Sequence, residues 1–155
     1  MNEAAEDPTI YEVIRSEHAR ISQLLEALAG EDTDEAEELF AEVRDRLERH
    51  ARAEEAVFYD ILVQNDEETR ALAREAEAEH SEVRRLLAEL EGMQAGGEAW
   101  QKGVASLTLA VQRHVEREEN EIFAAVEAIL DDDQARTLAE TFEAMEARVE
   151  SEEAA

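Results

Sequence analysis

The chain contains only four histidines, and they form two matching pairs. The first and third open similar segments, EHARISQLLEAL and EHSEVRRLLAEL. The second and fourth open HARAEE and HVEREE, with a glutamate four residues on. In chain order these residues are His18, His50, Glu54, His80, His114 and Glu118. Because histidine is rare here and always in register with an internal duplication, the pattern predicts a symmetric metal site.

Each histidine stands on an apolar stripe, where a leucine would otherwise be expected. Glu54 lies one helical turn beyond His50, and the second glutamate lies one turn beyond the fourth histidine, so each pair shares a helix face. Buried carboxylates are unfavourable unless they are paired, hydrogen-bonded or bound to a cation. Imidazole and carboxylate together suit iron, and also manganese or zinc. Two metals fit this ligand set better than one, since carboxylates can bridge.

The elements that must position these residues are predicted to be long helices. Glu, Ala, Leu and Arg dominate, with one proline and five glycines. Apolar residues recur in steps of three and four over 11–28, 40–61, 76–90 and 104–122, and short connections favour antiparallel neighbours. The prediction is an all-α, up-down-up-down antiparallel four-helix bundle over about residues 8–130. A short fifth helix, about 133–150, would dock on it within a single domain, 1–155.

Charge and composition exclude several classes of function. The net charge is -27, which argues against nucleic acid or an anionic membrane surface as partner. No apolar run is long enough to span a bilayer, and the acidic N-terminus is unlike a secretion signal. With no cysteine, disulfides and thiolate metal sites are excluded. We therefore expect a cytoplasmic protein.

The order His18, His50-ARA-Glu54, His80, His114-VER-Glu118 resembles the hemerythrin-like HHE cation-binding family, over about residues 10–130. The resemblance implies a four-helix bundle holding two iron ions, a non-haem di-iron centre. The first two histidines would serve one iron and the last two the other. The two glutamates would bridge the irons together with an oxo or hydroxo group, and oxygen would bind at an open position.

The chain departs from the oxygen-carrying members of that family at the third helix. Those members usually have a fifth histidine one turn before His80, where this chain offers Ala76 and Glu77. Alanine cannot bind metal, whereas Glu77 is three residues before His80 and can share its face. We therefore expect Glu77 as an extra ligand; the alternative is a solvated glutamate in an acidic run.

Two further assignments concern which glutamate after the fourth histidine is the ligand and where one tyrosine points. In a regular helix Glu118 is about 40° around from His114, and Glu119 is about 140° around, at about 100° per residue. Glu118 is favoured as the ligand unless the helix carries a local bulge. Tyr59 is nine residues after His50, so it is expected to point away from that histidine and to pack in the core.

Four functions are compatible with this pattern. The favoured one is a di-iron protein that binds O2, peroxide or NO for storage, sensing or scavenging. The alternative is a di-iron enzyme with catalase, peroxidase or ferroxidase-like activity, supplied by an unknown electron donor. A ferritin-like oxidase ranks lower, because its Glu-x-x-His motif occurs only at Glu77–His80. A metal-free interaction bundle ranks last.

Overall fold

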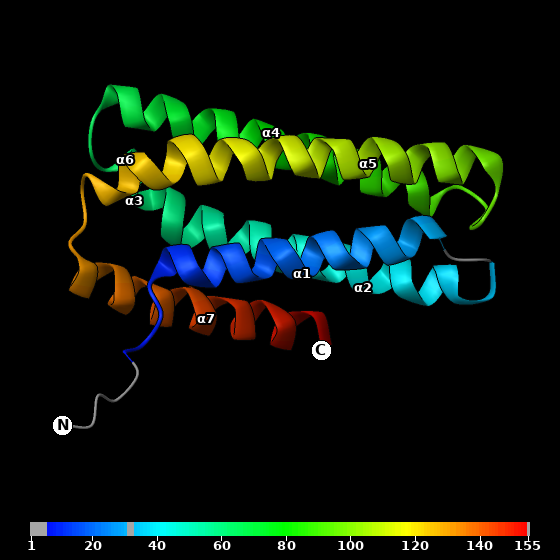
Figure 1. The fold of residues 1–155 in the computed structure, drawn as a ribbon, viewed down its shortest axis with the longest axis horizontal. Helices are drawn as coiled ribbons and strands as arrows, with labels where there is room; N and C mark the ends of the chain where they lie inside the picture. The colour runs from blue at the N-terminus through cyan, green and yellow to red at the C-terminus, as the bar shows by residue number, and fades with distance from the viewer. Residues whose placement is uncertain (1–5, 31–32, 155) are drawn as a thin grey trace.

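The structure, a computed structural model, describes residues 6–30 and 33–154, and within them it contains helices and no strands (Figure 1). Four long helical segments run side by side. They are α1 (Ile10–Gly30), α2 (Thr33–Ala53) with its continuations η1 (Glu54–Phe58) and α3 (Tyr59–Val63), α4 (Glu67–Glu91), and α5 (Glu98–Arg117) with its continuations η2 (Glu118–Ile122) and α6 (Phe123–Glu127). The predicted up-down-up-down four-helix bundle is confirmed.

Local sequence signals set the turns between these helices. Asp66 caps α4: its carboxylate accepts from the backbone N–H of Thr69 at 2.8 Å, and its own N–H donates to the Thr69 hydroxyl at 3.1 Å. The loop between α4 and α5 contains Gly96 at φ 83°, a left-handed conformation that glycine adopts without strain. Both connections are short, so successive helices lie antiparallel.

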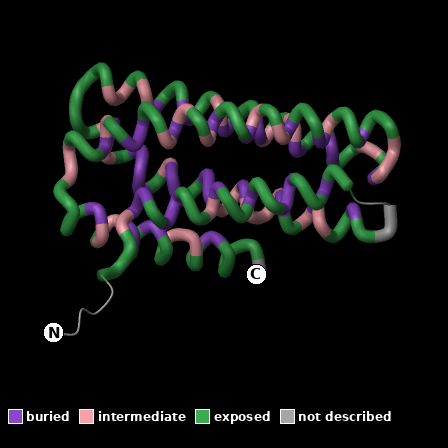
Figure 2. The backbone as a smooth tube through the Cα atoms, viewed as in Figure 1, coloured by how far each residue is buried: buried purple, intermediate pink, exposed green. Residues whose placement is uncertain are grey.

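Two hydrophobic clusters fill the bundle, and the buried positions line the inward sides of the helices (Figure 2). One cluster, at the end formed by α3 and α6, is rich in aromatic rings such as Phe58 and Phe123. The other occupies the opposite end and includes Leu107 and Trp100. The four histidines fall between the two clusters along the helices, so the polar layer is enclosed by apolar packing on both sides.

A π-helical segment interrupts the second and fourth long segments at matching positions. In η1 the N–H of Tyr59 bonds to the carbonyl of Glu54, and in η2 the N–H of Phe123 bonds to the carbonyl of Glu118. Each segment begins at the glutamate that lies four residues after a histidine. Such single-turn bulges insert one extra residue and rotate everything that follows. The duplication seen in the sequence therefore extends to the backbone distortion.

Helix α7 (Asp132–Ala154) packs against α1 and α2 on the outside of the bundle (Figure 1). Its buried face includes Ala139, Phe142 and Val149, which are at most 1% exposed. The predicted fifth helix is confirmed, and at 23 residues it is longer than expected. Within the described residues, none of the helices combines the length and hydropathy needed to cross a membrane.

Candidate metal centre

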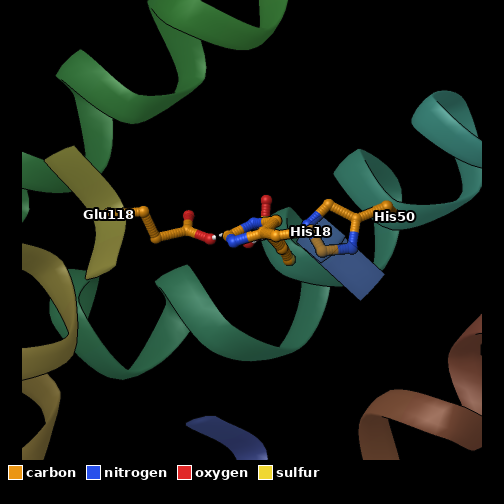
Figure 3. A group of neighbouring side chains, drawn as sticks. His18, His50 and Glu118 are labelled. Carbon is orange, nitrogen blue, oxygen red and sulfur yellow. Dashed lines mark ion pairs between the residues drawn. The ribbon is translucent and has the colours of Figure 1, made fainter. Parts of the chain in front are cut away.

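The six predicted ligand residues converge in the middle of the bundle, and each is at most 6% exposed. α1 and α4 each supply one histidine, and α2 and α5 each supply one near their ends. The glutamates are the first residues of η1 and η2 and are fully buried. Figure 3 shows His18, His50 and Glu118 directed toward one another from three different segments.

The ligand atoms form two groups that share one carboxylate. In the first group, His18 Nε2 lies 3.1 Å from Glu118 Oε1, and His50 Nε2 lies 3.2 Å from Glu54 Oε2. In the second, His80 Nε2 lies 3.0 Å from Glu54 Oε1 and 3.2 Å from the Nε2 atom of His114. Glu54 thus presents one oxygen to each group. This is the arrangement that a carboxylate bridging two cations requires.

The donor atoms are left without hydrogen-bond partners in a way that fits a bound cation. Among the described residues, the buried side-chain atoms without a partner include His18 Nε2, His50 Nε2, Glu54 Oε2 and Glu118 Oε1. These four atoms belong to one group, within 4.8 Å of one another. Leaving buried polar atoms unpaired is unfavourable by about 1–3 kcal/mol each. A cation held by two imidazoles and two carboxylates satisfies all four atoms, so the residues present fit a metal.

Tyr59 is buried in the core as predicted, but its hydroxyl lies among the ligand residues and does not point away from them. Its hydroxyl is 3.2 Å from Glu54 Oε1, 3.3 Å from His80 Nε2 and 3.4 Å from His114 Nε2, and it donates a short hydrogen bond to Glu118 Oε2. The prediction assumed an unbroken α-helix. Because η1 inserts one residue, Tyr59 is turned back by about 100° and faces the histidines.

Four outer carboxylates hold the histidine rings, one for each Nδ1 atom. His18 donates to Glu119 at 2.8 Å and His80 donates to Glu55 at 2.7 Å. The other two pairs join His50 to Glu17 at 2.5 Å and His114 to Glu79 at 2.8 Å. With Nδ1 donating, each Nε2 lone pair is free to face the centre. The sequence contained this signal, because EH occurs once in each half and EE follows four residues after the second and fourth histidines, but these glutamates were lost among 42 acidic residues.

The positions of Glu77 and Glu118 in the structure can be compared with the two predictions made for them. Glu77 lies on the exposed face of α4, outside the groups of ligand atoms, so the prediction of an extra ligand there is wrong. The position one turn before His80 on its own face is Ala76, which is fully buried. Glu118 is the buried carboxylate and Glu119 is 29% exposed, because the bulge begins only after the turn that joins Glu118 to His114.

Electrostatics couple the imidazoles to the carboxylates. Burial lowers the pKa of His50, but the charge of Glu54 and a hydrogen bond to Glu17 outweigh it, so the pKa is well above its ordinary value. Burial likewise lowers the pKa of His114, yet hydrogen bonds to carboxylates outweigh this effect and raise that pKa to about 12. Burial raises the pKa of Glu54, but the charge of His50 reverses this and holds that pKa well below the ordinary range. Burial, followed by the charges of the two central glutamates, raises the pKa of Tyr59 well above its ordinary value.

A family model for the hemerythrin HHE cation-binding domain matches residues 9–126. The chain belongs to this family. The fold of this HHE domain is also that of a solved protein, the HHE cation-binding domain-containing Rv2633c homolog from Mycobacterium kansasii. The two agree with a TM-score of 0.82 and 23% identity, over 94% of this chain and 89% of the other.

A relative found by sequence is a DNA nickase from Nostoc sp. (strain PCC 7120 / SAG 25.82 / UTEX 2576), which is 28% identical over 148 residues. The match includes 94% of the HHE domain chain but only 41% of the nickase. Family membership and the buried histidine–glutamate cluster together support metal binding by this HHE domain.

Proposed function

We propose that this HHE domain holds two iron ions and binds a small ligand such as O2, peroxide or NO. The observation that carries the proposal is the set of four orphaned ligand atoms together with Glu54, which presents one oxygen to each ligand group. When bound, the di-iron pair would supply electrons and open coordination positions. Manganese or zinc suits the same donors.

The protein residues have separate roles in this proposal. His18 and His50 would hold one metal, and His80 and His114 the other. Glu54 belongs to both ligand groups, and Glu118 has one oxygen 3.1 Å from His18 Nε2 and the other 3.4 Å from His114 Nε2, so the two central glutamates would bridge. The outer carboxylates fix the tautomer and orientation of each ring. Tyr59 donates a hydrogen bond to Glu118 and lies beside the second histidine pair, so it orients the bridging carboxylate or adds a ligand to that metal.

The cavity beside the histidines favours a ligand of two or three non-hydrogen atoms. It measures about 30 Å³, and its lining includes all four imidazoles and the apolar side chains Ile21, Val83 and Leu87. A water molecule needs about 10–15 Å³ of such space. O2, NO and peroxide fit this size, whereas an organic substrate does not.

A second candidate function, reduction of peroxide or O2 by an enzyme, is favoured by Tyr59. Its phenol is a buried O–H donor within 3.4 Å of the Nε2 atoms of both His80 and His114, so it could deliver a proton at the centre. Electrons would come from a donor outside the chain. We place either function in the cytoplasm. DNA is not part of the proposal, because a net charge of -27 repels a polyanion.

The two functions can be separated by adding O2 to the reduced, iron-loaded protein and following its absorption spectrum. A ligand-binding role predicts a long-lived oxygenated spectrum that reverses when O2 is removed. An enzyme predicts rapid oxidation with consumption of reductant or peroxide over many turnovers. A protein that loads with iron but shows neither response would contradict both functions.

A further inference from the structure

One partly exposed ion pair lines the cavity beside the histidines. Apart from the histidines, the charged side chains that line it are Glu48 on α2 and Arg84 on α4. Arg84 Nε lies 3.0 Å from Glu48 Oε2, and Arg84 Nη2 lies 2.9 Å from Glu48 Oε1. Each side chain is 34% exposed, so the pair contacts both the cavity and the solvent. It joins two helices across the wall of an otherwise apolar space.

The same arginine is connected to the metal centre. Arg84 Nη1 donates to Glu55 Oε2 at 3.0 Å, and that oxygen also accepts from His80 Nδ1 at 2.7 Å. Arg84 can therefore release Glu48 and keep its bond to Glu55. The ring of His80 would stay in place while the wall of the cavity opens.

Two other openings approach the histidines less directly. The groove between α1 and α5 reaches only His18, and Val111 and Val115 stand between it and the cavity. The groove beside α7 is polar, and it reaches His50 on the side where the Nδ1 atom is hydrogen-bonded to Glu17. Glu48 and Arg84, by contrast, line the same cavity as all four imidazoles.

We infer that the Glu48–Arg84 ion pair is a gate that controls how fast a small neutral ligand enters and leaves the cavity. The inference rests on the proposed function, because it requires a ligand that binds at the centre. A gate changes the rates at which the ligand crosses the cavity wall, but it does not change the free energies of the free and bound states. Opening it must raise the association and dissociation rates by the same factor and leave Kd unchanged. A residue that tuned the metal itself would change Kd.

The test is stopped-flow binding and release of NO by the reduced, iron-loaded protein, comparing wild type with Glu48→Ala. NO is neutral, so the lost charge does not steer it. Removing a partly exposed ion pair should raise both rates up to about fivefold, with Kd and iron content unchanged. The matched control is Glu82→Ala, which removes a glutamate paired with Arg85 on α4, away from the cavity, and should leave both rates unchanged.

A second variant tests the competing route. Ser22→Trp narrows the groove between α1 and α5 at an exposed position and should leave the NO rates unchanged. The gate would be overturned if Ser22→Trp slows NO binding, or if Glu48→Ala leaves the rates unchanged or shifts Kd. The proposed function would still stand in each of these cases. If the iron-loaded wild type binds no NO, the proposed function and the gate fall together.

Discussion

Glu17 hydrogen-bonds the Nδ1 atom of His50 on the neighbouring helix, and not that of His18, the residue beside it in the sequence. The duplication repeats this relationship, since Glu79, which precedes His80, bonds the Nδ1 atom of His114. In each EH dipeptide the histidine faces the centre, and the glutamate orients a histidine ring on another helix. The helices are held in register by the same residues that shape the donor set.

These outer bonds should control metal affinity. Glu79→Gln removes the charge that orients His114, so affinity for the metal is expected to fall by about 10–100-fold while the protein still folds. Titration with zinc against a chelating dye measures this. Glu77→Gln is the matched control two residues away, because Glu77 is exposed and outside the centre. Equal affinities in the two variants would contradict the orienting role.

Tyr59 should stabilise the fold through its hydroxyl. Tyr59→Phe leaves the buried carboxylate of Glu118 without its donor, and the metal-free protein should lose about 1–3 kcal/mol of unfolding free energy. Urea unfolding measures the change. Tyr11→Phe is the control, because the Tyr11 hydroxyl is buried without a partner and its removal should be neutral or slightly stabilising. A neutral Tyr59→Phe would show that its hydroxyl is not satisfied as described.

Metal affinity should rise with pH. The surrounding carboxylates raise the pKa of His50 and of His114, so a metal that binds at either imidazole must compete with a proton. Each displaced proton makes affinity increase by about tenfold per pH unit. The stability of the metal-free protein should change with pH in the opposite direction to metal affinity. The stability from a histidine with a raised pKa is present in full below the unfolded value of about 6.5, and it is lost as the pH rises through the folded pKa.

The difference in Tm between zinc-loaded and metal-free protein should therefore widen from pH 6 to pH 8. Differential scanning calorimetry at matched ionic strength provides the measurement. A difference that stays constant or narrows over this range would mean that no protons are exchanged for the metal at these histidines.

Helix α7 should be an integral part of the fold because it covers the back of the centre. Phe142 is fully buried, and its ring centroid lies 6.0 Å from that of His50. Phe142→Ala is expected to lower unfolding free energy by about 3–5 kcal/mol. Leu109→Ala, at a position that is 47% exposed, should change it by less than about 0.5 kcal/mol. Similar effects in both variants would mean that α7 is not docked as described.

The bundle and its six central residues were predictable because both follow from helical periodicity. An apolar stripe with steps of three and four places His18 or His80 inward whatever the neighbouring helices do. Tyr59 was not predictable in this way. Nothing in the letters EEAVF distinguishes a π-helical segment from an α-helical one, and one inserted residue turns the tyrosine by about 100°.

The outer carboxylates escaped prediction for a different reason. Periodicity assigns a residue to a face of its own helix, whereas Glu17 acts on a histidine of the adjacent helix. That pairing depends on how two helices are packed and rotated. The same limit explains the error at Glu77, where spacing allowed two neighbouring faces and packing selected the one that carries Ala76.

The most direct test of the account is the metal content of each chain after anaerobic loading with ferrous iron and removal of excess metal. Two ligand groups sharing Glu54 predict about two irons per wild-type chain. His80→Ala, which removes one histidine of the second group, should lower that number, whereas Glu77→Ala should not. A folded wild-type protein that retains no iron, or a full complement retained by His80→Ala, would contradict the assignment of this cluster as a two-metal centre.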